Sequence, residues 1–165
     1  MKTLAMILLC FFASGDDKEA GKEIFDIEKY MGYWYEIARY DHSFEKGLSH
    51  VKTTYTLNDD GTVKVENRGI RPDGKPKTAT GRAKMPDPSR PHHLRVSFFL
   101  WFYSDYDILY IDPEYRYALI GSSSDKYLWI LSRTPSISDD VKKKILDTAH
   151  SKGYDTSRLI WVEQG

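Results

Sequence analysis

The chain is nearly devoid of cysteine and has no net charge. Cys10 is the single cysteine among 165 residues, so no disulfide can form within the chain. The 24 Lys and Arg residues balance 24 Asp and Glu residues, giving a formal net charge of +0. This balance excludes the basic footprint of a nucleic-acid-binding protein. The sequence also lacks HExxH, GxSxG and phosphate-loop motifs, so we expect no metal, no cofactor and no catalytic residue.

Long hydrophobic runs are absent as well. The apolar stretch 4–12 is too short to span a bilayer, but it follows Lys2 and precedes the small residues 13–15. This order is typical of a secretory signal peptide. We therefore expect a signal peptide at 1–15, a flexible lead-in at 16–25 and one folded domain at 26–163.

A lipoprotein signal is the alternative interpretation of the same stretch. Cys10 would then be the acylated residue and would anchor the chain to a membrane. The residue before such a cysteine should be small, whereas here it is Leu9. Both interpretations predict export, and the choice between removal and acylation of Cys10 stays open.

Short runs of alternating apolar and polar residues follow residue 32. They recur about every ten residues and are separated by turn signals such as 58–61, a pattern typical of antiparallel β-strands. The expected strands are 33–40, 51–57, 62–70, 78–85, 94–98, 105–111, 116–122 and 127–133. The period then changes to that of a helix at 139–152, with Ser138 as its N-cap, and a short strand is expected at 159–162.

Eight strands joined by short turns can close into a barrel that holds one small ligand. The predicted fold class is all-β: an eight-stranded antiparallel up-and-down β-barrel with a C-terminal α-helix and a short final strand. A solid two-sheet sandwich is the alternative. The small residues Ala79, Gly81 and Ala83 share one strand face and favour a cavity.

The interior faces of the predicted strands give a candidate ligand site. Its members alternate with outward-facing residues, and they are mostly apolar or aromatic, as in a pocket for an amphiphile. They are Glu36, Ala38, Tyr55, Val65, Asn67, Phe98, Tyr106, Ile108, Tyr110, Trp129 and Leu131. Glu36 and Asn67 are either hydrogen-bonded structural groups or polar contacts to a ligand.

The aromatic run 99–103 has no obvious place in the core. Such a run is costly in solvent unless it packs on itself, on a partner or on a membrane. We expect Trp101 and Phe102 at the mouth of the barrel, in a membrane contact or in a dimer contact. Monomer and homodimer both stay open.

Three segments together resemble the signatures of the lipocalin family. They are Gly32-Tyr-Trp-Tyr-Glu-Ile-Ala-Arg39, Tyr115-Arg-Tyr-Ala-Leu-Ile120 and Trp129-Ile-Leu-Ser-Arg-Thr-Pro135, in the family's order and with the helix after the third. Within the family the sequence is most similar to the bacterial outer-membrane lipocalins and their apolipoprotein D-like relatives. The resemblance covers about 25–162.

The resemblance implies roles for several residues. Gly32 and Trp34 would form the closed floor of the barrel, with Arg133 over the indole and donating hydrogen bonds to nearby backbone. A fatty acid, phospholipid or lysophospholipid would enter at the other end, for non-enzymatic storage or transport in the bacterial envelope, in the periplasm or at the outer membrane. The alternatives are a lipocalin-like enzyme acting on a bound hydrophobic ligand and a structural envelope protein with a filled barrel.

Overall fold

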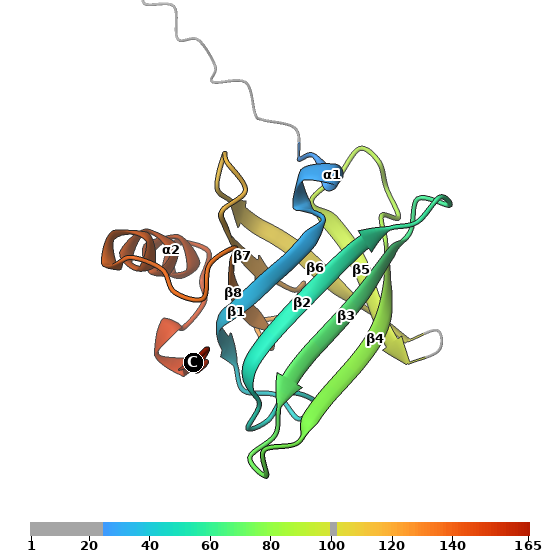
Figure 1. Ribbon diagram of the computed structural model, residues 1–165. Helices are drawn as coiled ribbons and strands as arrows, with labels where there is room; N and C mark the ends of the chain where they lie inside the picture. The colour runs from blue at the N-terminus through green and yellow to red at the C-terminus, as the bar shows by residue number, and fades with distance from the viewer. Residues whose placement is uncertain (1–24, 100–101) are drawn as a thin grey trace, which may run out of the picture.

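The computed structural model describes residues 25–99 and 102–165 (Figure 1). The predictions for the signal peptide, for the lead-in up to residue 24, for Cys10 and for Trp101 lie outside this part. The elements are α1 (Ile27–Tyr30), β1 (Gly32–Tyr40), β2 (Ser49–Leu57), β3 (Val63–Ile70), β4 (Pro76–Lys84), β5 (His93–Phe99), β6 (Phe102–Ile111), β7 (Tyr117–Gly121), β8 (Leu128–Ser132), α2 (Asp139–Ser151), the 3-10 helix η1 (Thr156–Arg158) and β9 (Leu159–Trp161). None of the helices in the described part has the length and apolar character of a membrane span.

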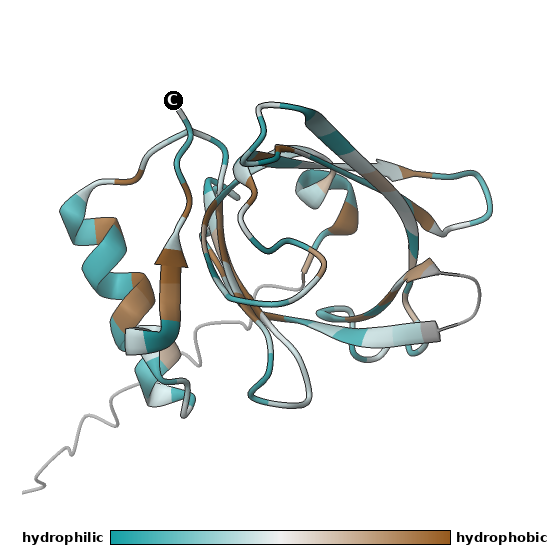
Figure 2. Ribbon diagram, turned by 90° about the horizontal axis from the view of Figure 1, so that it is seen from below, coloured by the Kyte–Doolittle hydropathy of each residue, from teal (hydrophilic) through white to brown (hydrophobic). Residues whose placement is uncertain are grey.

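The strands form a closed antiparallel barrel, as predicted. The hydrogen-bonded order runs from β2 through β8 to β1, and β1 pairs with β2 to close the ring. Each predicted strand is present, with bounds that shift by three residues or fewer. Figure 2 looks along the barrel from the end opposite α1 and shows the ring of strands, with the C-terminal helix outside it.

A short helix, α1, covers one end of the barrel, and the sequence patterns did not predict it. Asp26 is its N-cap, and the side-chain oxygen accepts a hydrogen bond from the Glu28 amide at 3.0 Å. Phe25 is 6% exposed and packs in the barrel core. The proposed lead-in 16–25 is therefore one residue too long at its end, because Phe25 already belongs to the folded domain.

Two apolar cores lie on opposite sides of the barrel wall. The first fills the interior at the end next to α1 and includes Trp34, Val63, Leu94 and Ile108. The second lies outside the wall and includes Ile130 together with residues of α2. The C-terminal helix therefore buries the outer surface of the barrel rather than its opening.

Two β-bulges reverse the alternation of side chains along β1 and β6. The register shifts between Glu36 and Ala38 on β1, and between Ile108 and Tyr110 on β6. Ala38 and Tyr110 therefore lie in the outer core beneath α2, and not inside the barrel as strict alternation predicted. One extra residue in a strand moves every later side chain to the opposite face.

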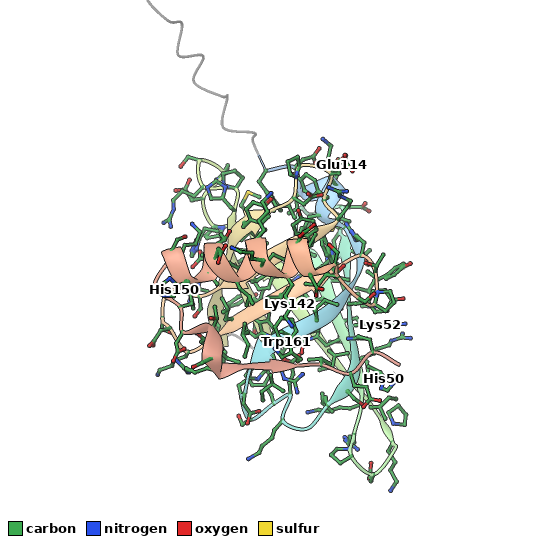
Figure 3. The ribbon with its side chains drawn as sticks, turned by 90° about the vertical axis from the view of Figure 1, so that its left-hand side faces the viewer. His50, Lys52, Glu114, Lys142, His150 and Trp161 are labelled. Atoms are coloured by element: carbon green, nitrogen blue, oxygen red, sulfur yellow. The ribbon has the colours of Figure 1, made fainter. Side chains whose placement is uncertain are left out.

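The C-terminal segment bridges the gap where β1 and β2 separate. Past the bulge, β1 leaves β2 and pairs with β9. The Gln164 amide nitrogen donates to the carbonyl of Glu36 at 2.6 Å and to that of Val51 at 3.0 Å. One side chain thus joins the two separated strands, next to the interior. In Figure 3, Trp161 of β9 and His50 of β2 lie along this side.

Candidate functional site

The barrel encloses a cavity of about 420 Å³. It extends to the end of the barrel opposite α1, because its lining includes Phe44, Glu45 and Leu48 of the β1–β2 loop, and this loop lies at that end (Figure 1). Of the eleven residues predicted to line the interior, the cavity wall contains Glu36, Tyr55, Val65, Asn67, Phe98, Tyr106, Trp129 and Leu131. Ile108 is interior but lies in the packed core outside the cavity wall. The interior is hollow, so the filled-barrel alternative does not fit.

Other lining residues were not singled out from the sequence. The apolar ones include Leu48, Val51 and Val96, and aromatic ones at the mouth are Phe44 and Tyr127. Val51 and Val96 stood on the dry faces of predicted strands, so their alternation could have identified them. Phe44 and Leu48 lie in a loop. The only sign in the sequence that they line the cavity is that they are apolar residues within a polar stretch.

The loop 41–48 folds into the mouth of the barrel. Arg39 holds it there, because its Nη2 donates to the carbonyls of Glu45 at 2.8 Å and Leu48 at 3.2 Å. Arg39 is 2% exposed and follows the bulge, which turns its side chain inward. From the sequence, its polar composition indicates only a long loop between two strands.

Glu45 is the centre of a polar cluster at the mouth. Its carboxylate accepts from the Trp129 indole Nε1 at 3.2 Å and from the Asn67 amide at 3.3 Å. The His42 Nε2 lies 2.8 Å from the same carboxylate, and Thr53 donates to Asn67 at 2.8 Å. Asn67 is therefore a hydrogen-bonded structural group that also lines the cavity, and its contact with a ligand stays a prediction.

Glu36 forms a buried pair with Arg39. The carboxylate accepts from Arg39 Nη1 at 2.7 Å, and both side chains are 2% exposed. Burial and repulsion from Glu45 raise the pKa of Glu36 to about 8, and Arg39 offsets this only in part. Burial opposes ionisation of Glu45 too, but the hydrogen bond and charge of His42 prevail and lower the pKa of Glu45. At neutral pH the site therefore holds a protonated Glu36 beside an ionised Glu45.

Three tyrosine hydroxyls meet at the inner end of the cavity. Tyr106 hydroxyl lies 2.7 Å from that of Tyr30 on α1 and 2.7 Å from that of Tyr55 on β2. Desolvation by burial raises the pKa of all three phenols, so they remain protonated. Tyr55 and Tyr106 line the cavity, whereas Tyr30 lies behind them.

Trp34 and Arg133 form the floor below the tyrosines. The Arg133 guanidinium carbon lies 3.8 Å from the Trp34 ring centroid, and the indole Nε1 donates to the Tyr30 carbonyl at 2.9 Å. Arg133 also donates to the carbonyls of Tyr33 at 2.9 Å and Lys29 at 2.8 Å. Gly32 has a φ of +92°, and a Cβ there would be 3.3 Å from the Arg133 Nη1. This is the arrangement that the family resemblance implied.

Two predictions for the mouth can be placed only in part. Phe98 lines the cavity and is 40% exposed, so an aromatic side chain does stand at the opening. Trp101 and the side chain of Phe102 lie outside the described part. Within residues 25–99 and 102–165, no group of three or more metal-ligating side chains is gathered in a way that could hold a metal ion.

Comparisons with known proteins agree with this geometry. Residues 25–164 match the family model of the lipocalin-like domain. The chain is 48% identical over 141 residues to outer membrane lipoprotein Blc of Escherichia coli K12, covering 85% of this chain and 80% of that protein. It is 41% identical over 143 residues to temperature-induced lipocalin-1 of Arabidopsis thaliana, covering 81% and 76%. Apolipoprotein D of Mus musculus is 34% identical over 151 residues, covering 87% and 79%.

Solved structures share the fold at lower identity. Lobster apocrustacyanin A1 aligns with a TM-score of 0.69 and 23% identity, covering 84% of this chain and 79% of that chain. Insecticyanin from the tobacco hornworm aligns with a TM-score of 0.68 and 19% identity, covering 84% and 80%. The barrel, its floor of Trp34 and Arg133, and the match over nearly all of the described residues lead to one assignment. The chain belongs to the lipocalin family.

Proposed function

We propose that this lipocalin is a non-enzymatic carrier of a single-chain lipid such as a fatty acid or lysophospholipid. The observation that carries the proposal is the hollow interior, a largely apolar cavity of about 420 Å³ with a closed floor. A cavity of this kind can remove an acyl chain from water, which favours binding by about 0.8 kcal/mol per buried CH₂ group. The family membership supports the same class of ligand.

The charges at the mouth support a head group that stays at the rim. Lys77 lines the outer part of the cavity, where a phosphate or carboxylate could approach it. The ionised Glu45 lies further inside and would repel an anion that went deeper. We therefore place the acyl chain inside and an anionic or zwitterionic head group beside Lys77.

Binding without conversion fits the side chains around the cavity. Among the described residues that line it, no Ser or Thr hydroxyl is hydrogen-bonded to a histidine, as an activated nucleophile would be. Glu36 has a raised pKa, but its carboxyl group is held by Arg39. These contacts support a structural role for Glu36 and a carrier rather than an enzyme.

Tryptophan fluorescence can test ligand binding directly. Trp129 lines the cavity, whereas Trp161 is 42% exposed on the outer face of the barrel. Hexadecanoic acid should change the emission of the wild type and of Trp161→Phe in a titration that saturates at about one molecule per chain. Trp129→Phe should lose most of this change. The absence of a saturable response in the wild type would contradict the proposal.

We further propose that the chain acts in the bacterial cell envelope. The signal-like residues 1–15 support export, and the bacterial relatives named above are outer membrane lipoproteins. Fractionation of cells that express the full chain should recover it outside the cytosol. Mass spectrometry of its N-terminus should find a start at Asp16 for a secreted protein, whereas an acylated Cys10 would identify a lipoprotein instead.

A further inference from the structure

The interior of the barrel is hollow towards the mouth and packed towards the floor, and the boundary lies at one level. On β3, Val65 lines the cavity, whereas Val63, two residues nearer the floor, belongs to the packed core only. On β6, Tyr106 lines the cavity, whereas Ile108, again two residues nearer the floor, does not. The cavity therefore ends at a layer that includes Tyr55 and Tyr106, and side chains fill the space between this layer and the floor.

Three tyrosines meet in this layer, and their hydroxyl groups form a closed ring. The Tyr106 hydroxyl lies 2.7 Å from that of Tyr30 and 2.7 Å from that of Tyr55. The hydroxyls of Tyr30 and Tyr55 are also hydrogen-bonded to each other. Each hydroxyl can therefore donate one hydrogen bond and accept one, so none of the three protons is left over. The ring is complete without a ligand, and a plain hydrocarbon end can face it at no cost in hydrogen bonds.

The closed ring holds these bulky side chains in place. Tyr30 is 1% exposed, and its ring centroid lies 5.0 Å from that of Trp34 and 5.2 Å from that of Tyr55. Moving one of the three tyrosines aside would break two of the three hydrogen bonds and leave buried hydroxyls without partners. This costs more than the burial of one further CH₂ group gains. An acyl chain that reaches the ring therefore stops there.

We propose that the Tyr30–Tyr55–Tyr106 ring is a rigid end stop that sets the maximum length of acyl chain that the cavity can bury. The inference rests on the proposed lipid-carrier function and refines it, because it makes chain length, rather than the head group, the property that is selected inside the barrel. Carbon atoms up to the ring are removed from water, whereas those of a longer chain remain at the mouth. Affinity should therefore rise with chain length only until the hollow part is full.

The test follows affinity along the series of saturated fatty acids from octanoic to icosanoic acid, measured by calorimetry. The proteins are the wild type, Tyr106→Ala, Tyr106→Phe, Val65→Phe and the control Tyr110→Ala. Tyr110 lies on the same strand as Tyr106 but packs in the outer core. Val65 is paired with Tyr55 across β2 and β3, so a larger side chain there adds bulk beside the ring. The readout is the chain length at which affinity stops rising, which a partial loss of folded protein does not shift.

In the wild type, affinity should rise by about fourfold per added CH₂ group and then level off. In Tyr106→Ala the levelling should occur at chains about three carbon atoms longer, because the missing phenol leaves space at the inner end. In Val65→Phe it should occur at chains about two carbon atoms shorter. Tyr110→Ala should match the wild type. Tyr106→Phe keeps the bulk but loses two hydrogen bonds of the ring, so its levelling should become gradual.

Levelling at one and the same chain length in the wild type, Tyr106→Ala and Val65→Phe would overturn the inference and leave the carrier function intact. Levelling in Tyr106→Phe as sharp as in the wild type would overturn the ring as a stop, since its hydrogen bonds would then have no part in the selection. If no acid of the series binds the wild type, the carrier function itself fails.

Discussion

Replacing Trp34 with alanine should lower the free energy of unfolding by about 3–5 kcal/mol. The indole is fully buried, donates to the Tyr30 carbonyl at 2.9 Å and supports the Arg133 guanidinium at 3.8 Å. Alanine would leave an empty space in the floor of the barrel and remove the aromatic surface on which Arg133 stacks. Chemical denaturation at constant pH, followed by circular dichroism, measures the change.

Trp161→Ala is the matched control for this prediction. Trp161 is 42% exposed, and its main partner is Lys142 of α2, whose Nζ lies 3.9 Å from the ring centroid (Figure 3). Its loss should cost about 1 kcal/mol, the value of an exposed cation–π contact with some packing. If Trp34→Ala destabilises the chain no more than Trp161→Ala does, Trp34 is not the floor of the barrel.

The pair of Glu36 and Arg39 should make stability depend on pH. The pKa of Glu36 rises from 4.5 to about 8 on folding. Between these values the folded chain binds more protons than the unfolded chain, so the free energy of unfolding should fall as the pH rises from 4.5 to about 8. The lowered pKa of Glu45 has the opposite effect on stability. It stabilises the folded chain at neutral pH, and this stabilisation is lost only as the pH falls below the ordinary pKa of a glutamate. Glu36→Gln should remove the fall between the two values.

Arg39→Met should be most damaging where Glu36 is ionised. At about one pH unit above the Glu36 pKa, the variant should lose about 1.4 kcal/mol more than it does at low pH, because loss of Arg39 raises the pKa of Glu36 further and the carboxyl group takes up a proton. In mildly acidic solution the loss should be smaller, because Glu36 keeps its proton. The double variant Glu36→Gln, Arg39→Met should recover part of the loss at high pH. A loss that is equal at all pH values would show that Arg39 acts only through the carbonyls of Glu45 and Leu48.

The sequence alone predicted the ring of strands and most of the residues that line the cavity. Alternation with a period of two, interrupted by turns, is a local property, so Tyr55, Val65 and Leu131 could be assigned to the interior from their neighbours alone. Trp34 and Arg133 are about one hundred residues apart. Their contact was expected only from the family resemblance.

The residues that the sequence misplaced depend on long-range backbone contacts. Alternation fails at Ala38 and Tyr110 because a bulge is set by the register against a partner strand, which composition does not reveal. The polar composition of the loop 41–48 gives no sign that Glu45 and His42 are buried. They are buried because Arg39, turned inward by the bulge, binds carbonyls of that loop.

The central claim, that the barrel carries a lipid in its hollow interior, can be tested by native mass spectrometry of the protein purified from the cell envelope. Ala79 lines the cavity, and its neighbour Thr80 is exposed on the outer face of the same strand. The wild type and Thr80→Trp should each retain about one lipid molecule per chain, whereas Ala79→Trp, which fills the cavity, should lose most of it. Equal lipid content in Ala79→Trp and the wild type, or no lipid and no uptake of added hexadecanoic acid by the wild type, would contradict the account.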